Sequence, residues 1–483
     1  GALADARLQL GRAIELFPHT DTPPHMRVRL YRLLLNALFG LGLMAECGTV
    51  LRQALADLHT PLPSGGGQQA LAILREVVRQ GAYRLYPRLV PHSRTEAETL
   101  LLEEQFRLHE IIAEYFLWHS QSAPGIHSLL LSANRAEEHG APHTVAAGGA
   151  ILAFLFCLTP FKALATSYCQ RSQQLLQPDM SAEVTVFVNR AIALTCACAG
   201  EAEETLRVAS VGLRLARGVG DIDAQMHLLL IQWIPLRTQG QLAAARAAAD
   251  QLLALALASE NEHFQTTAHG LLGGDLLRRG RLAESRAALE RSAHLAESRN
   301  YTEGSVFYEG MRALCALRQG DTARAQALAE QALQAIDQMV FSHDGAYDGY
   351  PACVETLCSL WESASERALR AHTERLLLRG IGVLRRYSFI FPDGLSCLHL
   401  FLGRYLFGRG LRAAGLRQIR RAEQIATQRG MLYEAALAQA WWGRFQQDAQ
   451  GVAELTRAHA ALRQLGADWD ADRVDGWLHG RGH

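Results

Sequence analysis

Residues 270–300 read GLLGGDLLRRGRLAESRAALERSAHLAESRN, and this stretch decides the fold. Its apolar residues recur three and four positions apart, which is the spacing of one face of an α-helix. Gly280 divides the stretch into two such patterns. Glycine adopts the left-handed conformation that commonly ends a helix more easily than other residues. The pattern therefore predicts two helices joined by a tight turn at Gly280.

The same design occurs four times at a fixed interval. The turn glycines stand 40 residues apart, at Gly200, Gly240, Gly280 and Gly320. A constant period in this range is typical of solenoids, because one helix pair cannot bury its apolar face alone and neighbouring pairs must stack. Strand patterns are nearly absent from the chain. The sequence thus predicts an all-α fold, a right-handed superhelical solenoid of antiparallel helix pairs.

Mostly small residues follow each turn glycine at fixed distances. Five residues after it stand Thr205, Ala245, Ser285 and Ala325, and twelve residues after it stand Gly212, Leu252, Ser292 and Ala332. Small side chains at these positions would let the second helix of a pair approach the first closely. We interpret the repeat as architectural and not as a chemical motif.

This arrangement resembles the tetratricopeptide repeat (TPR), which has two helices with a glycine between them. The matching positions in 271–293 are Leu272, Gly273, Leu276, Gly280, Ser285, Leu289 and Ser292. Further copies use Gly403, Leu406, Gly410, Gly415, Ile419 and Ala422 near the C-terminus, and Gly42, Cys47, Leu51 and Ala54 near the N-terminus. The large aromatic residue expected early in the first helix is mostly missing, and the period exceeds the usual 34 residues or so. The resemblance implies a TPR-like region that binds ligands on its concave face.

The chain as a whole resembles the C-terminal region of bacterial signalling ATPases of the STAND class, which include adenylate-cyclase-type and LuxR-type proteins. The segments that carry this resemblance are LYRLLLNALFGLGL, ALADLHTPLPSGGGQQ, LLLSANRAEEHGAP and ALRQLGADWDADRV. The resemblance implies a regulatory region whose catalytic module, if any, lies outside this chain. The opening ALADARLQLGRAIELFP starts within a helical pattern, as expected for a piece of a longer protein.

We expect five segments along the chain. Stretches rich in Pro, Gly or Ser mark breaks at 59–69 and 84–96, and a third break at 341–351 interrupts the 40-residue period. The expected segments are N-terminal helical pairs at 1–61, irregular helical repeats at 62–177, a regular TPR-like array at 178–340, a loop at 341–351, and a C-terminal TPR-like array with a capping helix at 352–483.

Composition limits the classes of function. The 48 basic and 48 acidic residues give a formal net charge of zero, which argues against direct nucleic-acid binding as the main task. The nine scattered cysteines favour buried, reduced thiols and a cytoplasmic protein. No apolar run reaches the roughly 18 residues of a membrane span, so we expect no membrane insertion. The apolar stretch 147–162 is expected to be a buried helix.

The motifs of common enzymes are incomplete. A Walker A loop needs lysine after a glycine-rich turn, and the one lysine, Lys162, has no glycine before it. HEIIA at 109–113 has Ala113 where a zinc protease needs its second histidine. We therefore predict no catalytic residue, cofactor or metal. Asp344 and Asp348 could flank a site, although a solvated loop is the favoured interpretation.

Candidate binding residues come from the first helices of the pairs, which line the concave face in TPR arrays. Those helices carry arginines, which can hold acidic groups in bidentate fashion. Three of them fall in the last helical turn, where a cation also interacts favourably with the helix dipole. Pro235 lies mid-helix beside two further candidates, at a ligand position or a tolerated kink. The concave-face candidates are Arg190, His227, Trp233, Arg237, Arg278, Arg318 and Arg404.

The sequence favours a non-catalytic TPR-like sensor or scaffold region. It would bind a protein, a peptide or a small effector on its concave face and regulate an attached or partner signalling module. One alternative is the small-molecule inducer-binding domain of a transcriptional regulator, and another is an unrecognised all-helical enzyme. A homo-oligomer is compatible with each of these.

Overall fold

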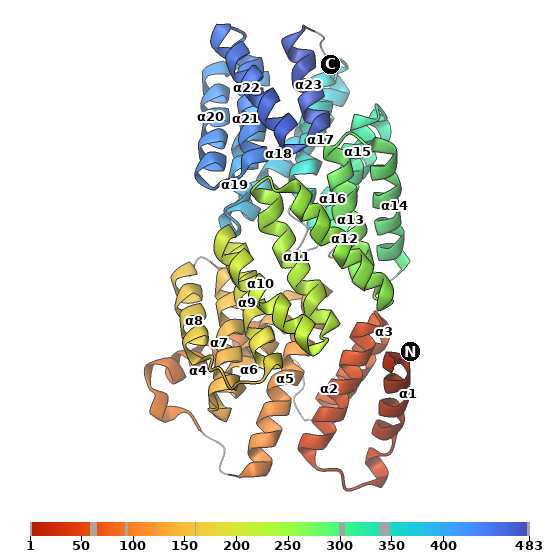
Figure 1. Cartoon of the computed structure of the whole chain (residues 1–483), viewed down its shortest axis with the longest axis vertical. Coiled ribbons are helices and arrows are strands. Elements are labelled where there is room, and N and C mark those ends of the chain that lie inside the picture. Colours follow the sequence, from red (N-terminus) through yellow and green to blue (C-terminus); the bar gives the residue numbers. More distant parts are fainter. Residues whose placement is uncertain are drawn as a thin grey trace. The chain divides into compact units, whose positions relative to one another are not determined.

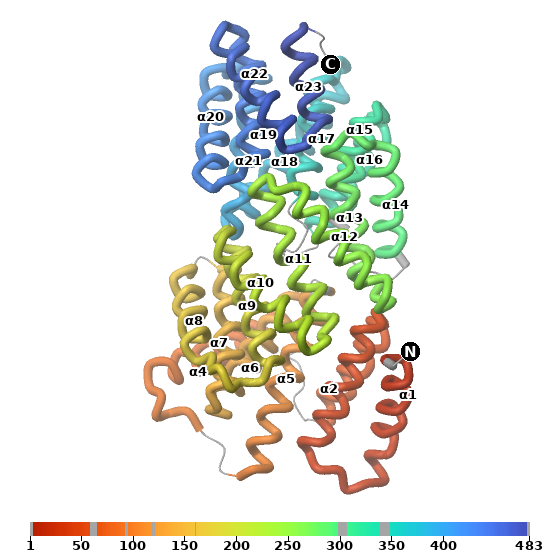
Figure 2. Tube along the Cα trace, viewed as in Figure 1, coloured from red at the N-terminus to blue at the C-terminus, as the bar shows by residue number. Residues whose placement is uncertain are grey.

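The computed structural model describes residues 2–57, 65–91, 95–119, 121–159, 161–298, 305–337 and 348–480. These residues form 23 α-helices and two short 3-10 helices, and no strand occurs within these ranges (Figure 1). Many successive helices lie side by side as hairpins, among them α5 with α6, α15 with α16, and α19 with α20 (Figure 2). The predicted all-α fold of stacked helix pairs is confirmed.

The chain divides into two compact units. Unit 1 comprises Gly1–Thr195, Val208–Leu228 and Leu255–Glu262, and unit 2 comprises Cys196–Arg207, Leu229–Ala254 and His263–His483. Five successive helices therefore contribute residues to both units, the last of them only Glu262 to unit 1: α9 (Ala182–Ala199), α10 (Ala202–Val219), α11 (Ile222–Thr238), α12 (Leu242–Ala258) and α13 (Glu262–Arg278).

Unit 1 holds the irregular part of the chain. Helix α2 packs on α1, α3 and α5, while α6 packs on α4, α5 and α7. Val28, Tyr31, Leu35, Leu51 and Leu108 are completely or almost completely buried in one core cluster. The elements of this part are α1 (Ala2–Glu15), η1 (Phe17–His19), α2 (Pro24–Gly40), α3 (Met44–Asp57), α4 (Gly66–Leu85), η2 (Pro87–Leu89), α5 (Glu96–Trp118), α6 (Ser122–His139), α7 (Pro142–Cys157) and α8 (Lys162–Leu175).

Unit 2 holds the regular pairs and the C-terminal helices. Each helix from α14 to α22 packs on the next one in the chain. The predicted loop 341–351 lies mostly outside the described residues, and α17 begins at Gly349. The helices are α13 (Glu262–Arg278), α14 (Leu282–Ser298), α15 (Ser305–Arg318), α16 (Thr322–Asp337), α17 (Gly349–Ser363), α18 (Arg367–Ile390), α19 (Gly394–Gly408), α20 (Arg412–Gln428), α21 (Leu432–Gln446), α22 (Ala449–Leu465) and α23 (Asp468–Leu478).

The repeated glycines end helices as predicted. Gly200, Gly240, Gly280 and Gly320 have φ values of 73°, 73°, 75° and 83°, in the left-handed region where residues with a Cβ are strained. The small residues after them are buried within the pairs. The Ser285 hydroxyl donates to the Gly273 carbonyl at 2.8 Å, which ties the second helix of that pair to the first.

Two other expectations concern buried helices and thiols. Helix α7 buries 12 of its 16 residues, so the apolar stretch is a buried helix as predicted. Eight of the nine cysteines are buried, and burial raises the pKa of the Cys47 thiol to about 12. In the described part of the chain, one helix, α9, is long and apolar enough to cross a membrane by length and composition. Core helices of globular folds meet the same criterion.

Candidate functional site

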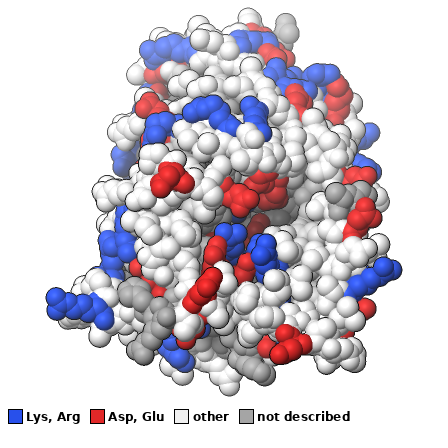
Figure 3. Space-filling view, turned by 60° about the horizontal axis from the view of Figure 1, so that its bottom comes forward, with Lys and Arg blue, Asp and Glu red and all other residues white. Residues whose placement is uncertain are grey.

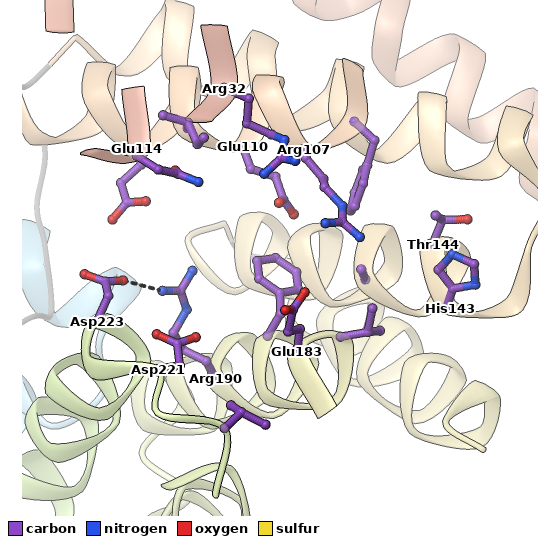
Figure 4. A pocket seen from close by; sticks show the side chains of 17 residues that line it. Arg32, Arg107, Glu110, Glu114, His143, Thr144, Glu183, Arg190, Asp221 and Asp223 are labelled. Atoms are coloured by element: carbon purple, nitrogen blue, oxygen red, sulfur yellow. Dashed lines mark hydrogen bonds and ion pairs between the residues drawn. The ribbon is translucent and has the colours of Figure 1, made fainter. Parts of the chain in front are cut away.

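A cavity of about 490 Å³ lies within unit 1. Helices α2, α5, α7 and α9 and the turn from α10 into α11 form its wall. Figure 4 shows charged side chains that enter it from opposite sides, with α2 and α5 facing α9 and α11. The charged lining residues are Arg32, Arg107, Glu110, Glu114, Glu183, Arg190, Asp221 and Asp223.

Helix α5 supplies one wall because its sequence places polar residues one turn apart. Arg107, Glu110 and Glu114 recur three and four positions apart and therefore share a face of the helix. The N-terminus of α5 is fixed by a capping box, in which the Thr95 hydroxyl accepts from the Glu98 amide while the Glu98 carboxylate accepts from the Thr95 amide. The helix thus carries these charges on a defined side.

Two of the three lining arginines pair with carboxylates that lie outside the cavity lining. Arg32 lies 2.7 Å from Glu104, and Arg107 lies 2.9 Å from Glu103. Neither of these glutamates lines the cavity. The pairs hold two guanidinium groups at the wall and offset their charge locally, which leaves the acidic lining residues in excess.

Arg190 lines the opposite wall and forms a charged cluster with His227, which does not itself line the cavity. Arg190 Nη1 lies 3.5 Å from Asp223 Oδ2 and 3.5 Å from His227 Nδ1. His227 lies between two carboxylates, 3.2 Å from Asp223 Oδ2 and 3.5 Å from Glu114 Oε1. Burial and the nearby Arg190 disfavour the imidazolium, but Asp223 and Glu114 outweigh them and raise the pKa of His227 to about 10. His227 is therefore a cation at neutral pH.

Glu110 is the neutral acid of the cavity. Burial raises the pKa of its carboxyl group to about 8, and the nearby Arg190 and Arg107 only partly oppose this. Glu110 Oε1 is buried and accepts no hydrogen bond from the described residues. A carboxyl group that stays protonated at neutral pH can donate a hydrogen bond as well as accept one. Arginines and carboxylates thus line both sides of the cavity, and Glu110 adds a neutral donor (Figure 4).

Unit 2 brings together four of the predicted arginines. Arg237, Arg278, Arg318 and Arg404 line a much smaller cavity, of about 50 Å³, and their side chains are buried. A cavity of this volume has room for little more than a water molecule. The carboxylates that pair with these arginines belong to the same chain.

Asp348 connects two of these arginines. Its Oδ1 lies 2.5 Å from Arg237 Nη2, and its Oδ2 lies 2.5 Å from Arg278 Nη2. Burial favours the protonated acid, but the two guanidinium groups outweigh it and keep the pKa of Asp348 below its usual value. The interpretation of Asp348 as part of a solvated loop is wrong, because only 4% of this residue is exposed. Asp344 lies outside the described residues.

A second carboxylate, Asp470, pairs with two arginines on the other side of this cluster. It lies 3.5 Å from Arg318 and 2.7 Å from Arg473, and it accepts a hydrogen bond of 2.7 Å from the Tyr433 hydroxyl. Burial opposes its ionisation, but the arginines keep the pKa of Asp470 below its usual value. Arg404 pairs with Glu362 at 2.7 Å and lies 3.7 Å from the Trp441 ring centroid.

The structure therefore separates the predicted candidates into two groups. Arg190 lines the unit 1 cavity and contacts His227 behind it, and the four arginines of unit 2 meet in the buried ionic cluster. Trp233 is buried in α11, which continues through Pro235, and lines neither cavity. Ligand binding by each of these residues remains a prediction.

Sequence reasoning missed the acidic lining residues. HEIIAE at 109–114 was considered only for a zinc site, yet Glu110 and Glu114 lie one turn apart and both face the cavity. Such an i, i+4 acid pair was the available indication. Within the described ranges, no group of three or more His, Cys, Asp or Glu side chains could hold a metal ion.

Searches against protein-family models and curated proteins gave no match. Solved structures do match. A Rap protein complexed with competence and sporulation factor has a TM-score of 0.54 and 11% identity over 84% of this chain and 99% of that chain. The chain has a TPR-like helical-repeat fold. At this identity the likeness to the Rap protein shows the fold alone.

Two other solved structures with a TPR-like fold are less similar. IFIT1, as a monomeric mutant with Gppp-AAAA, has a TM-score of 0.41 and 14% identity over 84% of this chain and 86% of that chain. Yeast Tom70 has a TM-score of 0.39 and 12% identity over 96% of this chain and 86% of that chain. Both scores are too low to support an argument about this TPR-like chain.

Proposed function

We propose that this chain is a non-catalytic TPR-like sensor region that binds a short peptide, or a small effector with both charges, in the unit 1 cavity. The observation that carries the proposal is the cavity itself. Its volume of about 490 Å³ lies in the range of ordinary ligand sites. Its walls carry Arg190, Glu110, Glu114 and Asp223, and His227 contacts the last two from behind the lining.

A peptide suits this distribution of charge. It carries an ammonium and a carboxylate group at its ends and amide groups between them, so it can pair with the lining carboxylates and the lining arginines at once. The Rap structure is consistent with this role, since a protein of the same fold was solved with a bound factor. The buried cluster of unit 2 is the weaker candidate because its arginines are paired within the chain.

The regulated partner would be a signalling module, attached or separate, as the resemblance to STAND-class ATPases implies. Ligand contact with α5, α9 and α11 at once would favour one arrangement of these helices over another. A ligand can shift such an equilibrium only by its difference in affinity for the two arrangements.

Affinity selection from a synthetic tetrapeptide pool, read by mass spectrometry, tests the binding. We expect the wild-type chain to retain a defined subset of peptides, and Arg190→Gln to weaken their binding by about tenfold or more through loss of a charge-assisted contact. Arg207→Gln is the matched control, because Arg207 is exposed on α10 and pairs with Glu204 outside the cavity.

The result has three readings. Retention of peptides by the wild-type chain and the control, but not by Arg190→Gln, supports the proposal. Equal retention by all three proteins places the peptide elsewhere and contradicts it. A thermal shift with one class of metabolite, together with no retained peptide, would favour an inducer-binding domain instead.

A further inference from the structure

Helix α4 packs against unit 1 through its polar side. Glu76 and Gln80 are buried, and the Asn134 amide of α6 donates to the Glu76 carboxylate at 2.9 Å. One turn further on, the Tyr83 hydroxyl donates to Glu138 of α6 at 2.9 Å. Gln80 lies 3.5 Å from the Tyr168 hydroxyl of α8. Hydrogen-bonding groups therefore face the protein along three turns of the helix.

The apolar side of α4 faces solvent. Leu71, Leu74, Val78 and Leu85 are 57–73% exposed and occupy positions i, i+3, i+7 and i+14, which form one stripe along the helix. Tyr86 and Leu89, just after the helix, are about equally exposed. An ordinary surface helix has the opposite orientation, with its apolar side against the core. A continuous exposed apolar stripe marks an interaction surface.

The exposed charged residues beside this stripe are arginines. Between 65 and 91 the one acidic residue is Glu76, and it is buried. Arg75, with a side chain that is 74% exposed, flanks the stripe on one side, and the exposed Arg84 flanks it on the other. Arg88 is exposed in η2. The surface formed by the stripe and these arginines, here called the α4 surface, is apolar and basic.

The positive charge of the α4 surface limits the kind of partner that can bind it. In a two-fold dimer through this surface, arginines of one copy would lie near arginines of the other, which is unfavourable. A straight partner helix would follow the stripe only to Leu85, because Tyr86 and Leu89 lie beyond the helix end. A lipid surface can contact all of these residues. Apolar stripes flanked by arginines are characteristic of helices that lie in a membrane interface.

We propose that the α4 surface binds the headgroup region of a bilayer that contains anionic lipids. Helix α4 lies in the plane of that interface, with the leucines of the stripe among the acyl chains and the arginines at the lipid phosphates. Nothing in this contact requires a segment to cross the membrane. The unit 1 cavity takes no part in it, so the two sites can be tested separately.

Co-sedimentation of the full chain with vesicles tests the proposal. Vesicles of phosphatidylcholine with and without phosphatidylglycerol are the probe. We expect binding to the anionic vesicles, a decrease with added salt, and little binding to phosphatidylcholine alone. Leu74→Gln with Val78→Gln should weaken binding about tenfold or more, since it removes two apolar contacts with the bilayer.

Two further proteins make the test specific. Leu411→Gln with Leu432→Gln removes equally exposed leucines of unit 2 and should bind like the wild-type chain. Arg75→Gln with Arg88→Gln should weaken binding to anionic vesicles and reduce its salt dependence. Circular dichroism checks that each variant keeps its helix content.

Three results would overturn the inference. The wild-type chain could fail to bind anionic vesicles at all. It could bind them as tightly after Leu74→Gln with Val78→Gln as before, or lose as much binding in the control Leu411→Gln with Leu432→Gln. Finally, a synthetic acidic amphipathic helix could bind the α4 surface in fluorescence anisotropy while vesicles do not, which would make the partner a protein.

Discussion

At the scale of single residues, the raised pKa of Glu110 makes the stability of the fold depend on pH. The native carboxyl group keeps its proton up to about pH 8, whereas in the unfolded chain it loses the proton near its ordinary value of 4.5. The native state thus binds more protons in that window, and its stability falls as pH rises through the window. Glu110→Gln stays neutral, so its melting temperature should fall less than that of the wild-type chain between about pH 5 and about pH 8.

Thermal unfolding followed by circular dichroism across this range measures the difference. Glu203→Gln is the control, because Glu203 is exposed on α10 outside the cavity. It should keep the wild-type dependence on pH. Parallel curves for the wild-type chain and Glu110→Gln would show that the buried carboxyl group does not hold the extra proton.

The predicted arginines show how far the sequence determines individual residues. Their positions near the ends of first helices predicted that Arg237, Arg278 and Arg318 share one side of the array, and the structure places all three at one cavity. Their partners could not be predicted. Asp348 precedes α17 and Asp470 lies in α23, both outside the 40-residue period, so no spacing in the sequence connects them with these arginines.

At the scale of elements, close helix packing should depend on glycines at the contact between α19 and α20. A Cβ at Gly403 would lie 2.9 Å from the Gly415 carbonyl oxygen and 2.5 Å from Ile419 Cγ1. Gly403→Ala should therefore force the helices apart and cost about 1–3 kcal/mol of unfolding free energy. Gly382→Ala in α18 should instead stabilise by about 0.5–1 kcal/mol, because a Cβ there meets no atom within 4 Å.

Urea unfolding of the two variants and the wild-type chain distinguishes these outcomes. The same chemical change should have opposite signs at the two positions. If both variants lose stability by similar amounts, helix packing at Gly403 is not the cause.

The elements also divide into those that the sequence determined and those that it did not. The turns at the repeat glycines were predictable because a helix end with positive φ needs glycine almost regardless of its neighbours. The orientation of α4 was not, because its apolar periodicity indicates a buried face and the structure exposes that face. Hydrogen bonds to Asn134, Glu138 and Tyr168 of other helices decide its orientation, and such contacts leave no periodic pattern in the sequence.

At the scale of the molecule, buried ion pairs connect positions far apart in the sequence within unit 2. Arg318 and Asp470 are separated by 152 residues, and Arg237 and Glu434 also meet, at 2.6 Å. The repeat period predicts which neighbouring helices pack, but it carries no information about such distant pairs. The cavity of unit 1 has the same origin, since α2, α5, α7, α9 and α11 all contribute to it. The architecture was therefore predictable and the sites were not.

The last prediction concerns the stability that Asp470 gives to unit 2 as a whole. The pKa of Asp470 is lowered in the folded protein, so its contribution is present above the ordinary value of 3.8 and is lost as pH falls below it. Asp470→Asn leaves Arg318 and Arg473 without this buried carboxylate, which should cost about 3–5 kcal/mol at neutral pH. The variant should also lose less stability than the wild-type chain on acidification. Asp472→Asn, two residues away and exposed, should change stability by at most about 1 kcal/mol. Thermal melts at neutral and acidic pH test this, and equal effects of the two substitutions would show that the buried pairs do not hold unit 2 together.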